Sequence, residues 1–544
     1  MSPSEDLTAH AMANQMPGNK LDLFGAVVKS LSGVSRDTRR IVVAAFCINL
    51  FAYGFLFANL TLNHDGFGFI TLDASWTRGT GRWLTDVLYA VLFRNFELIW
   101  LNGLLAMCFF IATALSISRV LRLAGLSERL VVALLYTLFP YMCSYYGYAF
   151  HVPIYALSSL LAVSAVEVTE RGGLGKCLLG ALLLAASLAC YQAFVASALT
   201  LVMLGAAAAL ARAESRESLT AIAWRVGRQM FALGLGCALY WLSIKVSVAV
   251  FNVQLVAYQG AASMGASDFA AVTRGLRVVL IETARFLGGR FQSIYPESSY
   301  FTWKDKALCA VVYLGAIAGI AAMARRMRGR SGAAVLMFLM ALFAPRVLQV
   351  AHPDGNYHEL TLTGYGVYLA GAAAFAMEMK NRIARSAVQL VLVVLICSFI
   401  HSNNVGAAAL AFDYQAIMHW GNRVLAMIEA DPRCAVQMGS WAPKRIMFVG
   451  DAYRVSDWFY RGRPFVTAVG IADGIPNIVF DSIFRLLRVN ATSVGIPPQT
   501  HSEGLAYAAR HEAWPHPESV TVLRDGTIVV VLSKPADGSA GVGR

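Results

Sequence analysis

About eleven long apolar runs divide most of this chain, and no other feature of the sequence constrains the fold as strongly. Each run is close to the roughly 20 residues that an α-helix needs to cross the hydrocarbon core of a bilayer. Hydrophobic residues make up 57% of the 544 residues and charged residues only 14%, and the mean hydropathy is +0.57, values outside the range of soluble proteins. The sequence therefore predicts a mainly α fold, a polytopic transmembrane helical bundle. The runs lie near 41–62, 98–117, 129–149, 152–168, 177–191, 193–211, 229–250, 306–324, 332–350, 360–377 and 387–403.

The basic residues between these runs predict how the chain crosses the membrane. If the polar tail 1–40 lies in the cytoplasm, alternation of the spans places every strongly basic short loop on that same side, as the positive-inside rule requires. The apolar stretch 177–211 must then form two spans that divide at Tyr191-Gln192, because a single span would invert every later loop. We interpret the net charge of +13 as a consequence of this topology and expect no nucleic acid partner.

The composition changes after the last run. We expect a transmembrane domain over 41–404, a compact domain outside the membrane over 405–535, and a disordered tail over 536–544. An amphipathic helix is predicted over 413–431 and buried strands over 445–450 and 464–470. A hairpin is predicted over 519–534, with its turn at Asp525-Gly526. These elements indicate a small α/β or α+β domain.

Three segments on the non-cytoplasmic side are candidates for the walls of a site: 62–97, 251–304 and 351–359. In the second segment, apolar residues recur at near-helical spacing between charged residues, which predicts a helix that lies on the membrane surface. The apolar residues are Val272, Leu276, Val279, Leu280 and Leu287, and the charged residues are Arg274, Arg277, Glu282, Arg285 and Arg290.

The first of these loops concentrates charge directly after an apolar helix, in the stretch LNHDGFGFITLDASWTRGTGRWL at 62–84. Asp65 lies at the depth of a lipid headgroup and can act as a general base that deprotonates an acceptor hydroxyl. Asp73 is the second candidate, and the alternative role of either aspartate is to cap the interfacial helix that follows. Arg78 and Arg82 are four residues apart, so on a helix they share a face and can hold phosphate oxygens. The alternative for both arginines is contact with lipid phosphates at the interface.

Further candidates come from other segments. Arg346 lies inside an apolar run, where a charge indicates a functional role such as phosphate binding, or a buried ion pair. Gln192 follows Tyr191 at the predicted break between spans and can bind a sugar hydroxyl. The loop 351–359 carries a polar cluster that can bind a divalent metal, although short loops are ordinarily polar. Its members are His352, Asp354 and His358.

The sequence holds no clear metal-ligand motif, and no cofactor is predicted from it. The nine cysteines lie mostly alone in apolar runs, and none has the paired spacing of a disulfide framework or a zinc site. Glycine loops with the context of a nucleotide site and the nucleophile elbow of hydrolases are also missing. A cytoplasmic nucleotide-sugar site is therefore unsupported.

Several motifs of this chain resemble the glucosyltransferase II family of bacterial membrane proteins, which modify O-antigen and have the architecture of C-type (GT-C) glycosyltransferases. The first loop contributes NHDG and GTGRW, and the predicted break contributes SLACYQAF. The loop 251–304 contributes QSIYPESS, and the helix after the last run contributes FDYQAIMHWGNRVLAMIE. The family often has a second acidic residue where this chain has His64, so the pair His64-Asp65 does not support a two-carboxylate or metal-bridged mechanism.

The resemblance implies a GT-C-like bundle in the bacterial inner membrane, with the C-terminal domain in the periplasm. The donor is expected to be a polyprenyl-phosphate-linked sugar, in the first place glucose, and the acceptor a hydroxyl of lipopolysaccharide O-antigen or a related glycan. Membrane lipids, an upstream lipid-sugar synthase and a flippase are the other expected partners. It implies Asp65 and Asp73 as catalytic residues and four arginines as ligands of the donor phosphate. These are Arg78, Arg82, Arg346 and Arg290, and contacts with sugar or acceptor are expected from His64, Tyr191, Gln192, His352, Asp354 and His358.

Two alternatives to this function remain open from the sequence. One is a transferase that moves another polyprenyl-phosphate-linked sugar onto lipid A or protein, since sugar identity depends on the shape of the pocket. The other is a transporter or flippase of a lipid-linked sugar. Transporters commonly show internal repeats and ionisable residues at the membrane midplane, whereas the polar clusters here lie at the ends of predicted spans.

Overall fold

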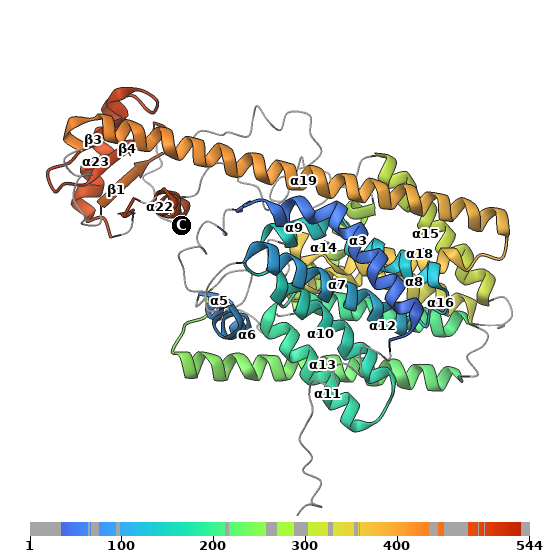
Figure 1. Cartoon of the computed structure of the whole chain (residues 1–544). Coiled ribbons are helices and arrows are strands. Elements are labelled where there is room, and N and C mark those ends of the chain that lie inside the picture. Colours follow the sequence, from blue (N-terminus) through green and yellow to red (C-terminus); the bar gives the residue numbers. More distant parts are fainter. Residues whose placement is uncertain are drawn as a thin grey trace, which may run out of the picture.

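The structure, a computed structural model, is a bundle of long helices with a small mixed domain at one end (Figure 1). The predicted strand at 464–470 and the predicted tail at 536–544 lie outside the residues that it describes. The described residues are 34–63, 66, 76–93, 98–212, 217–256, 269–287, 303–324, 330–352, 357, 359–434, 444–450, 477–487, 489–493 and 495–534.

Eight helices in the described part of the chain are long and apolar enough to cross a membrane, which confirms the mainly α polytopic bundle. A bent pair of helices, with 57° between them, is a ninth candidate, and two shorter apolar helices occupy the remaining predicted runs. The count of about eleven spans therefore stays a prediction. The eight are α3 (Arg36–Ala58), α7 (Ile99–Val120), α10 (Val152–Glu170), α12 (Phe194–Ala211), α13 (Leu219–Phe251), α15 (Trp303–Ala324), the segment Ser331–Val350, and α19 (Arg382–Ala430). The bent pair is α8 (Leu126–Thr137) with α9 (Tyr141–Gly147), and the shorter helices are α11 (Leu174–Cys190) and α18 (Gly364–Met377).

The predicted division of the apolar stretch 177–211 is confirmed. Helix α11 ends at Cys190, Tyr191 has extended backbone angles, and α12 begins at Phe194. The carbonyl of Cys190, which has no partner within its own helix, accepts a hydrogen bond of 2.8 Å from the hydroxyl of Thr85. The break is thus tied to the short helices of the first loop.

The segment Ser331–Val350 also changes geometry along its length. It consists of α16 (Ser331–Ala341), the 3₁₀ turn η3 (Ala344–Arg346) and α17 (Val347–Ala351). Pro345 lies within η3, where its ring cannot continue a regular α-helix. The irregular turn places Arg346 inside the bundle, since its side chain is fully buried.

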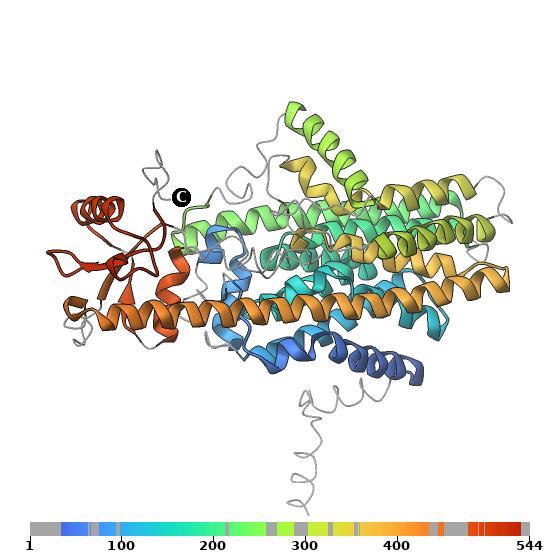
Figure 2. The same ribbon diagram turned by 90° about the horizontal axis from the view of Figure 1, so that it is seen from above.

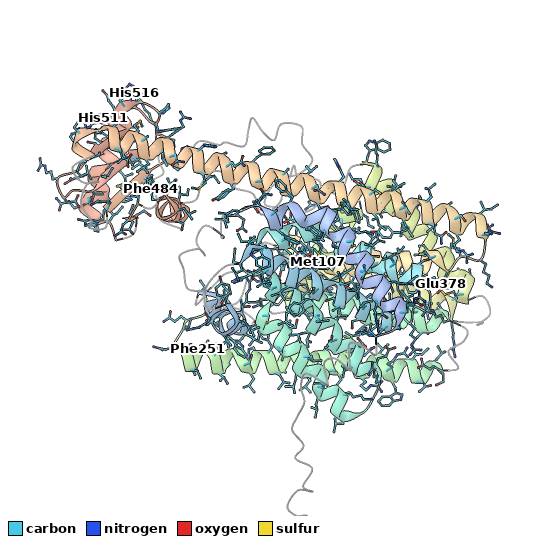
Figure 3. All side chains as sticks on the ribbon, in the orientation of Figure 1. Met107, Phe251, Glu378, Phe484, His511 and His516 are labelled. Carbon is cyan, nitrogen blue, oxygen red and sulfur yellow. The ribbon has the colours of Figure 1, made fainter. Side chains whose placement is uncertain are left out.

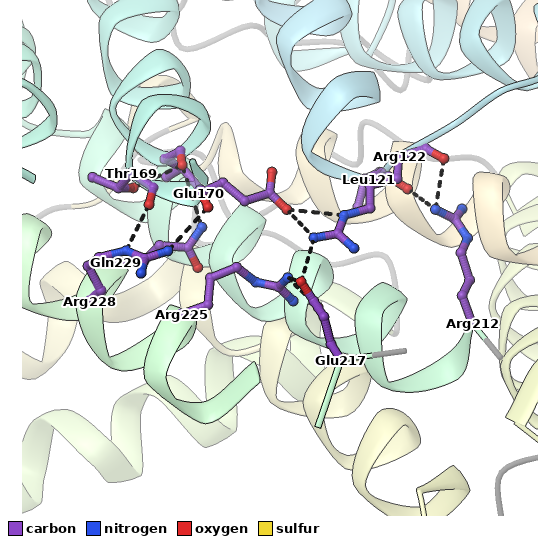
Figure 4. Close-up of polar contacts among 10 residues, drawn as sticks. Leu121, Arg122, Thr169, Glu170, Arg212, Glu217, Arg225, Arg228 and Gln229 are labelled. Carbon is purple, nitrogen blue, oxygen red and sulfur yellow. Dashed lines mark hydrogen bonds and ion pairs between the residues drawn. The ribbon is translucent and has the colours of Figure 1, made fainter. Parts of the chain in front are cut away.

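One end of the bundle gathers the basic loops that the sequence places on one side. We call it the basic end, and Arg122 lies at its centre, 3.1 Å from Glu170 and 3.4 Å from Glu217 (Figure 4). Arg225 pairs with Glu217 at 2.7 Å. Burial raises the pKa of Glu217, but the charges of Arg225 and Arg122 and their hydrogen bonds outweigh this effect and hold that pKa below its usual range. The basic end is formed by Arg119, Arg122, Arg171, Arg212 and Arg225 with their glutamates.

The terminal domain projects from the other end of the bundle. Figure 3 shows Glu378, which pairs with Arg212, at the basic end, and Phe484 of the terminal domain beyond the opposite end. The domain holds a four-stranded sheet of order β2-β1-β4-β3, in which β1 is parallel to both neighbours and β3 and β4 are antiparallel. The predicted hairpin is confirmed, with Gly526 at φ +82° in its turn. The strands are β1 (Lys444–Val449), β2 (Ala491–Thr492), β3 (Val520–Val522) and β4 (Ile528–Val531), and the helices are α22 (Asn477–Leu486) and α23 (Pro498–Arg510).

The amphipathic helix predicted over 413–431 is not a separate element. It is the second half of α19, a single helix of 49 residues that begins in the last apolar run (Figures 1 and 2). The linking residues VGAAALAF contain no proline and three alanines in a row, which favour helix. Ile417, Trp420 and Val424 of this half pack in one core with Phe480 and Phe484 of α22. The same helix therefore belongs to both the bundle and the terminal domain.

Candidate functional site

The described part of the first loop consists of two short helices joined by a tight turn. Helix α5 (Trp76–Gly79) ends one residue before the turn at Thr80-Gly81, and α6 (Trp83–Leu88) continues into the π-helical turn η1 (Tyr89–Phe93). Gly81 has φ +79°, a conformation that residues with a side chain rarely adopt. The prediction that Arg78 and Arg82 share a face of one helix is therefore wrong, because this turn separates them.

Arg82 is the predicted phosphate ligand that the structure places deepest in the first loop. Its Nε donates a hydrogen bond of 3.2 Å to Oε1 of Gln192, and its Cζ lies 4.6 Å from the centre of the Tyr191 ring. The side chain is buried, so the guanidinium is held by a cation–π contact and an amide in surroundings of low polarity. The structure thus brings together three candidates from two distant segments, Arg82, Tyr191 and Gln192.

Gln192 connects this arginine to the backbone of the turn and to α13. Its Nε2 donates to the carbonyl of Thr80 at 2.9 Å and to the hydroxyl of Tyr240 at 2.8 Å. The Tyr240 hydroxyl in turn donates to the carbonyl of Gly81 at 3.2 Å. Both amide hydrogens of Gln192 are therefore in use within the protein, which favours a role in positioning Arg82 over the predicted direct contact with sugar. Sequence reasoning missed Tyr240, whose position inside an apolar run gave no signal.

Arg78 is held differently. Its Nε donates to Oδ2 of the buried Asp86 at 2.5 Å, and its Cζ lies 4.2 Å from the centre of the Phe251 ring. The carbonyl of Gly79, next to Arg78, accepts a hydrogen bond of 2.9 Å from the amide of Val256. The charge of Arg78 is thus compensated by a carboxylate, and α5 is fixed to the end of α13. Sequence reasoning missed Asp86, although an acidic residue in the apolar context WLTDVLYAVLF was a readable signal.

A group of packed aromatic rings, the aromatic wall, lies behind Arg82. Tyr191 packs against Tyr155 with ring centres 4.6 Å apart and against Tyr145 at 6.4 Å. His151, which precedes α10, lies 5.7 Å from Tyr155. Burial and then the positive charge of Arg82 lower the pKa of His151 from 6.5 to about 3, so its imidazole is neutral at pH 7. The aromatic wall consists of Tyr145, Tyr155, Tyr191, Phe194 and His151.

Arg346 forms the core of a second cluster. Its Nε donates to the hydroxyl of Tyr365 at 3.2 Å, and its Nη1 lies 3.6 Å from Oε2 of Glu282. The ion pair is one of the two roles that the sequence left open for Arg346. Nevertheless, Nη1 and Nη2 have no hydrogen-bond partner among the described residues. The guanidinium therefore keeps donors available for a further acceptor.

Glu282 comes from α14 (Phe269–Leu287), which confirms the helix predicted inside the loop 251–304. Leu276, Leu280 and Leu287 are exposed, as expected for residues that face lipid, whereas Val279 is buried in the protein. Glu282, which the pattern places among the polar residues of a surface helix, is buried on Arg346. Glu282 lies seven residues after Gly275 and therefore on the same helix face, and this spacing in the sequence could have indicated that Glu282 faces the protein.

The aromatic wall joins the two arginine clusters. The hydroxyl of Tyr145 donates to the carbonyl of Leu360, which follows Glu359 at the start of the turn η4 (Glu359–Thr361). The charges of Arg346 and the buried Glu359 both act on the hydroxyl of Tyr141, which lies on α9 with Tyr145. One short helix thus contacts both the Tyr191 side and the Arg346 side of the candidate site.

Not every predicted site residue can be placed. His352 directly follows α17, is half-buried, and its carbonyl accepts a hydrogen bond of 2.9 Å from the hydroxyl of Tyr357. Among the described residues, no group of three His, Cys, Asp or Glu side chains is arranged to hold a metal ion. The roles of the other candidates stay predictions because these residues lie outside the described ones: His64, Asp65, Asp73, Arg290, Asp354 and His358.

Comparison with known protein families matches a large part of the chain. Residues 54–369 match the family model described as Glucosyl transferase GtrII, which covers more than half of the chain. The matched region contains Arg82, Gln192 and Arg346 and ends before the terminal domain. No curated protein and no solved structure matches the chain.

Proposed function

The chain belongs to the glucosyl transferase GtrII family and is a membrane glucosyltransferase, and we propose that its donor is a polyprenyl-phosphate-linked glucose. The acceptor in this proposal is a hydroxyl of lipopolysaccharide O-antigen or a related cell-surface glycan. The reaction takes place at the periplasmic face of the bacterial inner membrane, with the N-terminus in the cytoplasm and the domain 405–535 in the periplasm. A lipid-sugar synthase and a flippase supply the donor.

The observation that carries this proposal is Arg346, a fully buried guanidinium in an apolar bundle whose Nη1 and Nη2 have no hydrogen-bond partner in the described part of the chain. A charge in this position is costly unless it has a function or a full set of partners. A phosphodiester that ends in a long apolar chain supplies both an anionic acceptor and a lipid-soluble body. Arg82 offers a second buried positive charge across the aromatic wall.

In the proposed reaction, the acceptor oxygen attacks the anomeric carbon of the donor sugar. The bond between that carbon and the phosphate oxygen breaks, and its electron pair stays on the phosphate. The acceptor proton passes to a carboxylate, for which Asp65 is the first candidate and Asp73 the second. Arg346 and Arg82 stabilise the charge that develops on the leaving phosphate, with Arg78 and Arg290 as further ligands.

Substitution of Arg346 tests the proposal. Wild-type and Arg346→Gln proteins in membrane vesicles are supplied with polyprenyl-phosphate-[¹⁴C]glucose and acceptor glycan, and incorporation of label is measured. We expect transfer to fall roughly 10²- to 10³-fold, the usual effect of removing one group that stabilises transition-state charge. Arg277→Gln, an exposed arginine of α14, is the matched control and should transfer at the wild-type rate.

Two results would contradict the proposal. One is an unchanged rate in Arg346→Gln. The other is transfer from a nucleotide-linked glucose in vesicles that lack polyprenyl phosphate, because the donor would then be a different class of molecule.

A further inference from the structure

The contact between Glu282 and Arg346 is incomplete as an ion pair. The 3.6 Å between Nη1 and Oε2 is longer than a hydrogen bond, and neither of these atoms has a hydrogen-bond partner among the described residues. The other oxygen of Glu282 accepts from Nη1 of Arg285 at 2.6 Å. Glu282 is thus held mainly by Arg285, which is half exposed, and places negative charge beside Arg346 without occupying its donors.

Two close contacts fix the orientation of α14 and therefore keep the carboxylate of Glu282 beside Arg346. A Cβ on Gly275 would lie 2.6 Å from the carbonyl oxygen of Gln349 and 2.7 Å from Cα of Val350, so the absence of a side chain permits close contact with α17. At the other end of the same face, Phe286 stacks on Tyr365 with ring centres 3.6 Å apart and planes 9° apart. Glu282 lies between these two points and faces Arg346.

The proposed reaction changes the charge of the group at Arg346. The donor is a phosphodiester with one negative charge. After the glycosidic bond forms, the carrier leaves as a phosphate monoester, whose second ionisation has a pKa of about 6 and which therefore carries a charge near −2 at pH 7. A carboxylate close to Arg346 repels this product more strongly than it repels the donor.

On the basis of the proposed function, we infer that Glu282 determines specificity at Arg346: it admits the singly charged donor and expels the doubly charged polyprenyl phosphate. Arg346 attracts both molecules, so without Glu282 the spent carrier would be the tighter ligand and would inhibit the enzyme. One extra unit of charge roughly 6–12 Å from a carboxylate, at an effective dielectric constant near 20, corresponds to roughly 10- to 100-fold in affinity.

Replacement of Glu282 by Gln removes this charge with little change of shape. Purified enzyme in nanodiscs is assayed with a short-chain polyprenyl-phosphate-glucose, and the inhibition constant of the matching polyprenyl phosphate is measured beside the KM of the donor. In Glu282→Gln we expect the inhibition constant to fall at least 10-fold and the KM to fall less. An equal change in both constants, or no change in the inhibition constant, would overturn the inference.

The pH dependence of product binding separates this role from a structural one. Below about pH 6 the monoester binds a proton and carries one charge, like the donor. The difference in polyprenyl phosphate affinity between wild type and Glu282→Gln should therefore shrink as the pH falls from 7.5 to 5.5. A structural defect would persist at both pH values. Among the described residues, the ionisable groups near this site are Arg346, Arg285, Tyr365, Tyr141 and Glu359.

A matched pair of arginine variants keeps the inference testable if Glu282→Gln is unstable. Arg285→Gln leaves Glu282 less neutralised, so product affinity should fall several-fold, opposite in sign to Glu282→Gln. Arg277→Gln makes the same change on the same helix and should have no effect. If the two variants behave alike, the inference fails. If wild type does not use the polyprenyl-phosphate donor at all, the proposed function fails first.

Discussion

Replacing Gln192 by Leu removes three hydrogen bonds around Arg82 while it keeps a side chain of similar size. The lost bonds join Gln192 to Thr80 at 2.9 Å, to Tyr240 at 2.8 Å and to Arg82 at 3.2 Å. Neutral hydrogen bonds contribute about 1 kcal/mol each and one to a charged group about 1.5–3 kcal/mol. The free energy of unfolding should therefore fall by about 3–5 kcal/mol.

The same substitution should also lower the transfer rate. Arg82 keeps its contact with the face of Tyr191 but loses the amide that fixes its direction, and a displacement near 1 Å in a catalytic site commonly lowers the rate about 10²-fold. Unfolding of purified protein in denaturant and glucose transfer in vesicles measure the two effects. Gln389→Leu, on the exposed surface of α19, is the control and should change neither. A loss below 1 kcal/mol together with a wild-type transfer rate would refute the role assigned to Gln192.

Three further outcomes are expected. Gly319→Ala should lower the free energy of unfolding by about 1–3 kcal/mol or more, because the new Cβ would lie 2.0 Å from a carbonyl oxygen of α18. Gly332→Ala is the control in the same denaturation assay and should be close to neutral, because no atom lies within 4 Å of its new Cβ. The pKa of Glu217 is lower in the folded protein than in the unfolded chain, so its ion pair with Arg225 stabilises the fold at pH values above the pKa of the unfolded chain. This stabilisation should be lost as the pH falls through the pKa of Glu217 in the folded protein. The free energy of unfolding should therefore depend less on acid pH in Glu217→Gln. Asp65→Asn should abolish transfer in a protein that still inserts at the wild-type level, and an active, well-inserted variant would exclude Asp65 as the base.

The spans were predictable because hydrophobicity acts locally along the chain. Runs of apolar residues identify the helices directly, and the break at Tyr191 follows once the basic loops are required to share one side. The hairpin turn at Asp525-Gly526 was predictable for the same reason, since turn preferences are local. Local patterns therefore predicted both the bundle and part of the terminal domain.

Pairings between distant side chains were not predictable in this way. The prediction that Arg78 and Arg82 share a face assumed that one continuous helix runs through Gly81. The positive φ of Gly81 instead separates the segment into two short helices. The partners Asp86 and Glu282 depend on how elements pack, which a periodicity does not contain. For Glu282 the face that it shares with Gly275 was readable, but its partner Arg346 lies in a turn that begins 62 residues later in η3.

The unbroken course of α19 has a consequence for the terminal domain. A helix of 49 residues is about 73 Å long, more than twice the roughly 30 Å of hydrocarbon, and it enters the core of the domain without a joint. The number of residues in this continuous helix therefore sets both the rotation of the terminal domain about the helix axis and its distance from the bundle along that axis. Each residue inserted between 404 and 412 would rotate the domain about the helix axis by about 100° and move it about 1.5 Å farther from the bundle. Seven inserted residues would nearly restore the original orientation of the domain, at a distance about 10 Å greater.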